Sequence, residues 1–183
     1  PKTEQSSLTA TSFVAELGEG FAEAYRHPWF IAGLAALTLV IAFGYSVTNV
    51  LLPQISEAQY GGPQLMATSV TAYTIGAFAG ALIISRWKPK DIGWLALVGL
   101  ALYGFVPLSL LFSNIFFLPV IAFFLAGIGI EFFNVPWFTA AQREIPQDRL
   151  ARVTSVDFLF SYGLAPLGLA GLTPLTQMVG TDA

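Results

Sequence analysis

The sequence predicts an all-α fold, a polytopic membrane bundle of five transmembrane helices. Hydrophobic residues make up 55% of the 183 residues and charged residues only 10%, whereas soluble domains average about 25% charged residues. Five apolar runs recur along the chain, and each has the roughly 20 residues that a helix needs to cross a bilayer. A soluble fold of this length would have too few charges for its exterior.

The five predicted spans are separated by short polar loops. They cover about residues 29–52, 64–85, 92–112, 115–138 and 153–178. Three of them contain an internal proline, at Pro107, Pro136 and Pro166. Membrane helices tolerate such prolines because neighbouring groups satisfy the carbonyls that proline leaves unpaired.

The eight lysines and arginines lie in three segments that alternate with segments holding none. Two precede the first span, three lie in the loop 86–91 and three in the loop 142–152. Five helices that cross in alternation put all three segments on one side of the membrane. Positive residues concentrate on the cytoplasmic side. We therefore expect a multi-pass protein of the plasma (inner) membrane with a cytoplasmic N-terminus.

Residues 1–28 differ from the predicted membrane bundle, 29–183. Their apolar residues share one helical stripe, and Glu16, Glu19 and Glu23 lie on the opposite side. This pattern predicts a cytoplasmic linker with a short amphipathic helix. We expect the helix to pack on protein, since helices that bind anionic lipid usually carry lysine and arginine.

One carboxylate, Glu131, lies within the fourth span, and Asn134 follows it on the same helical face. Charged groups inside a bilayer are costly, face protein or water, and usually serve a function. The two residues are thus candidates for a proton site or substrate pathway. The alternative is a structural ion pair between Glu131 and a cytoplasmic arginine, such as Arg143 or Arg86.

The first span carries a second polar stripe, which includes Tyr45 and Asn49. These residues lie in the outer half of the membrane, so we do not expect them to touch Glu131. They are candidates for another level of the same pathway. The alternative is that polar side chains of this stripe bond to carbonyls of their own helix.

Charged residues at the cytoplasmic ends form a candidate gate. Its members are Arg86, Lys88, Arg143, Arg149, Arg152 and Asp157. Asp157 has two interpretations. An acid in the first turns of the fifth helix is favoured by the helix dipole, or it pairs with a loop arginine in one conformation only.

Small residues mark expected helix contacts. Gly76 and Gly80 have the GxxxG spacing that lets two backbones approach, and Gly163 and Gly168 lie in the fifth span. The simpler explanation is that glycine is common in membrane helices.

The composition argues against an enzyme. With one histidine and no cysteine, the chain lacks a Ser–His pair within a span, a thiol nucleophile and a metal-ligand cluster. We expect no metal and no cofactor. The net charge of −3 gives no basic footprint for nucleic acid. The expected partners are the lipid bilayer and a small-molecule substrate.

The segment 127–171 resembles the C-terminal half of major facilitator superfamily transporters, in particular the bacterial branch of macrolide-efflux and enterobactin-export proteins. The matching residues are Gly127, Gly129, Glu131, Gln142, Ile145, Pro146, Leu150, Arg152, Val153, Ser155, Pro166 and Gly168. The stretch EGFAEAYRHPWF resembles the end of the linker between the two six-helix halves. SRWKPKD resembles a degenerate copy of the cytoplasmic basic motif, with Ser85 in place of the usual Asp.

The resemblance implies that the five spans are helices seven to eleven of a twelve-helix transporter. The sequence would then be a fragment, with the N-terminal six-helix half and the twelfth helix missing. It also implies that the first and fourth spans line the central cavity. The implied function is proton-coupled export of small hydrophobic or amphipathic molecules by alternating access. The alternative is a membrane scaffold or partner-binding subunit without transport.

Overall fold

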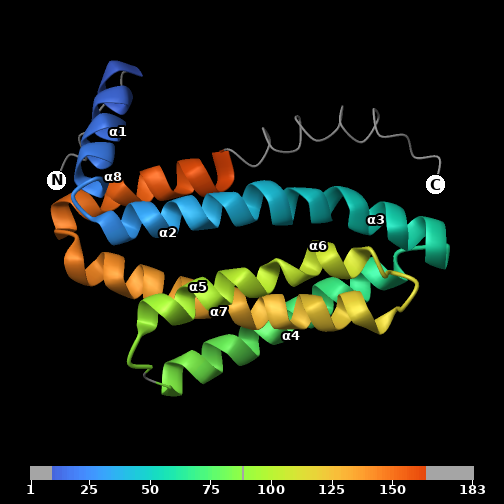
Figure 1. Cartoon of the computed structure of the whole chain (residues 1–183). Coiled ribbons are helices and arrows are strands. Elements are labelled where there is room, and N and C mark those ends of the chain that lie inside the picture. The colour runs from blue at the N-terminus through green and yellow to red at the C-terminus, as the bar shows by residue number, and fades with distance from the viewer. Residues whose placement is uncertain (1–9, 88, 164–183) are drawn as a thin grey trace, which may run out of the picture.

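The computed structural model describes residues 10–87 and 89–163, and every regular element in these ranges is a helix. The elements, shown in Figure 1, are α1 (Ala10–Ala24), α2 (Pro28–Leu39), the π-helix η1 (Val40–Tyr45), α3 (Ser46–Tyr60), α4 (Gln64–Arg86), α5 (Ile92–Tyr103), α6 (Phe105–Leu110), α7 (Phe117–Glu144), α8 (Gln147–Phe158) and the π-helix η2 (Leu159–Gly163). The all-α prediction is confirmed.

Four helical stretches are long and apolar enough to cross a membrane. They are Pro28–Tyr60, Gln64–Arg86, Ile92–Leu110 and Phe117–Glu144. They correspond to the first four predicted spans. Most of the predicted fifth span, 153–178, lies outside the described residues, so the count of five stays a prediction.

The first membrane helix is longer than the sequence pattern indicates. We predicted its end near residue 52, before Pro53, but α3 continues through this proline to Tyr60. Gly61 then ends the helix because it adopts a left-handed conformation, with φ of 65°. Its N–H donates to the carbonyl oxygen of Glu57 at 2.9 Å.

Glycines set the central packing, in which α4 and α5 both lie along α7. A Cβ atom on Gly76 would overlap the carbonyl oxygen of Phe124, and one on Gly127 would overlap that of Tyr73. A Cβ on Gly80 would lie 2.7 Å from the carbonyl oxygen of Ile128. The two backbones therefore touch directly, as in other small-residue contacts between membrane helices.

Two apolar cores lie along this bundle. The core at the end nearest α1 and α8 contains Ala24, Phe30, Leu34, Leu100, Phe133, Trp137, Ala141, Ile145, Val153 and Val156. The core toward the other end contains Leu52, Leu65, Tyr103, Val106, Leu110, Ala122, Phe123 and Ala126. The membrane helices and α1 are thus packed into one body.

The basic segments gather at one end of the molecule. Figure 1 shows α1, the start of α8 and the α4–α5 loop at the end on the left, and the α3–α4 and α6–α7 turns at the opposite end. This arrangement is the alternation that the distribution of lysine and arginine predicts. It makes the left-hand end the expected cytoplasmic end.

Candidate transport pathway and cytoplasmic gate

Glu131 lies on α7, half-buried against α4. A Cβ atom on Gly80 would come within 3.2 Å of the Glu131 Cβ, so the absence of a side chain at Gly80 makes room for this residue. Within residues 10–87 and 89–163, the carboxylate has no ion pair and no hydrogen bond. Neither Arg86 nor Arg143 reaches it, so the structural ion pair that the sequence left open is not formed in this conformation.

Asn134 continues the polar face of α7. It is half-buried, whereas its neighbour Phe133 is buried. Gln142, further along the same face, is exposed at the end of the helix. The three polar side chains share one face of α7, as their helical spacing predicts, and Phe138 lies between Asn134 and Gln142 on that face.

Tyr45 and Asn49 lie on an exposed face of the first membrane helix. The Asn49 amide donates to the Tyr45 carbonyl oxygen at 2.9 Å, and Thr48 donates to the Gly44 carbonyl oxygen at 2.8 Å. Both bonds are of the alternative kind, in which a side chain bonds to its own helix. The Tyr45 ring faces Tyr103 of α5, with 6.4 Å between ring centroids. Tyr45 thus lies beside α5, whereas Glu131 lies beside Gly80 of α4.

A π-helical turn, η1, places these residues, and the sequence pattern did not reveal it. The N–H and the hydroxyl of Ser46 both bond to the carbonyl oxygen of Ile41, five residues earlier. Gly44 within this turn leaves space for Tyr103, whose ring carbon would be 3.0 Å from a Cβ there. Tyr103 in turn bonds to Thr48. Such π-turns often occur at functional sites.

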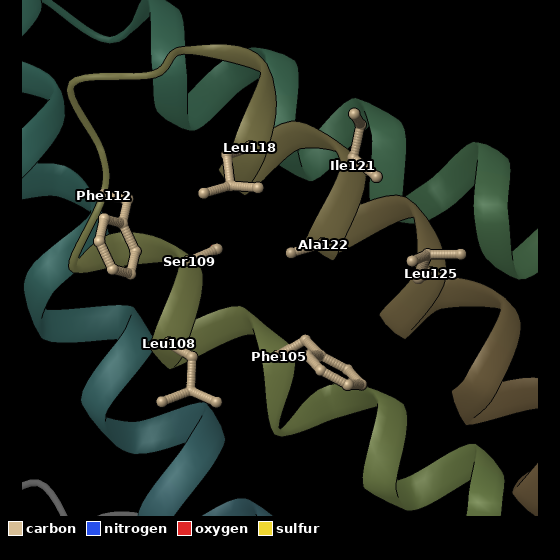
Figure 2. A pocket seen from close by; sticks show the side chains of 8 residues that line it. All are labelled: Phe105, Leu108, Ser109, Phe112, Leu118, Ile121, Ala122 and Leu125. Carbon is tan, nitrogen blue, oxygen red and sulfur yellow. The ribbon is translucent and has the colours of Figure 1, made fainter.

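An apolar hollow of about 260 Å³ lies between α6 and the first half of α7. Figure 2 shows its lining residues, which are Phe105, Leu108, Ser109, Phe112, Leu118, Ile121, Ala122 and Leu125. The only polar side chain among them, Ser109, donates its hydroxyl to the Val106 carbonyl oxygen at 2.7 Å. The hollow therefore suits hydrocarbon and holds no free group for polar recognition.

Two of the predicted gate arginines form ion pairs with α1. Arg149 binds Glu23, with 2.5 Å between Nη1 and Oε2, and Arg152 binds Glu19 at 2.7 Å. The two helices approach closely at Gly20, which has no side chain. A Cβ atom there would lie only 2.6 Å from the Arg152 carbonyl oxygen. We call this contact between α1 and α8 the α1–α8 clamp.

Glu23 is the centre of the clamp, and its role was not foreseen. Its side chain is only 9% exposed and also lies 3.1 Å from Arg26 and 3.9 Å from His27. The hydrogen bond from Arg149 is the main cause that lowers the pKa of Glu23 below its ordinary 4.5, and the same bond raises the pKa of Arg149. The spacing of Glu23, Arg26 and His27 at i, i+3 and i+4 was the available signal.

The structure contradicts the first interpretation of Asp157, and the second, an arginine pair in one conformation only, stays a prediction. The helix begins at Gln147, so Asp157 lies near the end of α8 and away from the first turn, where the helix dipole would favour it. It is buried, and its hydrogen-bonding neighbours are Trp137 and Ser161, the latter at 3.5 Å. No arginine pairs with it in the part of the chain described.

The other predicted gate and packing residues form no contact with another helix that supports their predicted role within the described residues. Arg86 and Arg143 are exposed and lack an ion pair among the described residues. Gly163 lies in η2, where a Cβ would meet Leu159 of its own turn at 3.1 Å rather than another membrane helix. Lys88 and Gly168 lie outside the described residues.

The clamp predicts an acid-sensitive attachment of α1. Because the folded pKa of Glu23 is lowered, its contribution is complete above its ordinary pKa of 4.5 and is lost as the pH falls through the lowered value. Glu23→Gln should remove this contribution at all pH values. Spin labels at the exposed positions Gly18 and Gln147 measure the α1–α8 distance. We expect a broadened distribution for Glu23→Gln at neutral pH, and for the native protein only in acid.

The matched control is Glu16→Gln, which removes a carboxylate from the same helix. Glu16 forms no ion pair within the described residues, so this variant should keep the native distance. A distribution that stays narrow in Glu23→Gln, or that broadens equally in Glu16→Gln, would contradict the clamp.

The comparison with protein families agrees with this architecture. The family model for the Major Facilitator Superfamily matches residues 1–169, which is most of the chain. No curated protein and no solved structure matches the chain. Members of this family are membrane transporters rather than enzymes, and the four long apolar helices fit such a function. The chain belongs to the major facilitator superfamily.

Proposed function

We propose that this chain is the C-terminal part of a secondary active transporter that exports small hydrophobic or amphipathic molecules in exchange for protons. The observation that carries the proposal is Glu131. It is a half-buried carboxylate on an apolar helix of 28 residues, and it has no cation partner in the described ranges. A carboxylate kept inside a membrane without a structural ion pair is suited to bind a proton or a substrate cation.

The surroundings of Glu131 favour a pathway along α7. Asn134 lies on the same face of this helix, and Gln142 lies further along that face at the expected cytoplasmic end. The polar residues Tyr45 and Asn49 lie exposed on the first membrane helix, which is expected to line the cavity with α7. Few polar groups surround this path, and such a lining suits substrates that are largely apolar.

The clamp supports alternating access as the mode of transport. Transporters built from two repeats move one repeat against the other around a central site. In our proposal α1 is the end of the linker between the two halves. The ion pairs of Glu19 and Glu23 with α8 would make the linker move with this half. Residues Arg149 and Arg152 then hold the cytoplasmic end in place as the other half moves.

Reconstitution of the full-length transporter tests the function. Proteoliposomes with an imposed pH gradient should move amphipathic dyes such as rhodamine 6G or Hoechst 33342 against their concentration gradient. An ionophore that collapses the pH gradient should stop this uphill movement. Dye movement that stays unaffected by the ionophore would reject proton coupling, and no saturable movement of any dye in a broad panel would reject this substrate class.

A further inference from the structure

The cations at the expected cytoplasmic end fall into two groups. Arg149 and Arg152 form ion pairs with Glu23 and Glu19 of α1, and Arg26 shares the Glu23 carboxylate. By contrast, the side chains of Arg86, Lys90 and Arg143 are exposed and form no ion pair or hydrogen bond within the described part of the chain, and the first two lie at either end of the α4–α5 loop. Their charge remains available to a partner outside this chain.

Two exposed tryptophans accompany these cations. Trp87 directly follows α4 and is 51% exposed, and Trp94, in the first turn of α5, is 72% exposed. The other two tryptophans are more buried, with Trp137 in the core and Trp29 half-buried. Tryptophan is enriched where a membrane helix meets the headgroup layer, since its ring is apolar and its N–H is polar.

The helix that follows the loop faces lipid. Every exposed side chain of α5 and α6 in the structure is apolar, including Leu97, Val98, Phe105 and Leu108. A surface that lines an aqueous path would carry polar groups, whereas an apolar face of this kind fits contact with lipid chains. The loop therefore lies at the bilayer edge of the bundle, across from the clamp (Figure 1).

We propose that the α4–α5 loop binds the headgroup of an anionic phospholipid through Arg86 and Lys90, with Trp87 and Trp94 in the headgroup layer. The two cations supply the charge complementarity, and clusters of basic residues next to a membrane helix attract anionic lipids. The Trp87 ring also packs edge-on against Phe132, with 6.3 Å between centroids. Phe132 is the residue after Glu131, so Trp87 connects the proposed lipid site to the helix of the candidate proton site.

Quenching of tryptophan fluorescence by brominated lipids tests this proposal directly. The full-length transporter is placed in vesicles of phosphatidylcholine that contain brominated phosphatidylglycerol or brominated phosphatidylcholine. The signal of the loop is the part that disappears in the double variant Trp87→Phe/Trp94→Phe. We expect stronger quenching of this part by brominated phosphatidylglycerol, and we expect high salt to reduce the difference.

Charge variants distinguish a headgroup site from a general effect. Neutralising Arg86 and Lys90 to glutamine should lower the preference for phosphatidylglycerol over phosphatidylcholine by about fivefold per residue, before salt screening. Arg152→Gln removes one charge at the same end, but that charge is paired with Glu19, so the preference should remain. Equal quenching by the two lipids, or a preference that survives in the Arg86/Lys90 variant, would overturn the proposal. The latter result would assign the lipid preference to other residues of the transporter.

Discussion

Replacing Glu131 with glutamine is expected to reduce uphill, pH-driven export to the level of protein-free vesicles. The amide has nearly the same size as the carboxyl, but it does not gain or lose a proton at physiological pH. The site would thus keep its shape against Gly80 and lose its charge change. Exchange of dye across the membrane without a pH gradient should continue, because that process needs no net proton movement.

Glu144→Gln is the matched control for this experiment. It makes the same change at the last residue of the same helix, where the side chain is exposed. Export should remain at the native level and keep the native pH dependence. Unchanged export and unchanged pH dependence in Glu131→Gln would reject the proton role. Loss of both uphill export and exchange would instead place Glu131 in substrate binding.

Alanine at Gly127 or Gly76 is expected to cause the largest loss of stability in the bundle. At both positions the added methyl group would overlap a backbone carbonyl oxygen of the facing helix. A backbone cannot turn aside as a flexible side chain does, so α4 and α7 must separate. Overpacking of a close contact costs about 1–3 kcal/mol, and each kcal/mol lowers Tm by about 2–4 °C in proteins of this size.

Gly93→Ala provides the comparison within the same membrane bundle. Nothing lies within 4 Å of a Cβ at Gly93, so this substitution should not lower Tm. Thermal unfolding of the detergent-solubilised protein, followed by intrinsic fluorescence, measures all three variants. Equal Tm values for Gly127→Ala and Gly93→Ala would show that the close contact of α4 and α7 does not hold the bundle together.

The sequence was informative where the membrane itself imposes a pattern. Bilayer thickness determines the length of the apolar runs. The distribution of basic residues indicates which end of each run lies on the cytoplasmic side. Both features were readable in the chain, and four of the predicted spans appear as long apolar helices. Glu131 could also be singled out from the sequence, because a carboxylate within a membrane span is costly and usually serves a function.

Contacts between distant residues could not be read in this way. Glu23 and Arg149 are 126 residues apart in the chain, and no local pattern pairs them. The π-turn η1 depends on a hydrogen bond from the Ser46 N–H to the Ile41 carbonyl oxygen, five residues earlier instead of the usual four. The residue types in this segment do not reveal that bond. GxxxG spacing singled out Gly76 and Gly80, but not Gly127, whose approach to Tyr73 is equally close.

Simultaneous recording of proton entry and dye efflux tests the central claim most directly. Proteoliposomes of the full-length transporter would contain a pH-sensitive dye, and rhodamine 6G would serve as the transported molecule. The account predicts that adding transportable dye starts a proton flux in the opposite direction in the native protein, and that Glu131→Gln shows none. Dye transport without any proton movement in the native protein, or an equal proton flux in Glu131→Gln, would contradict it.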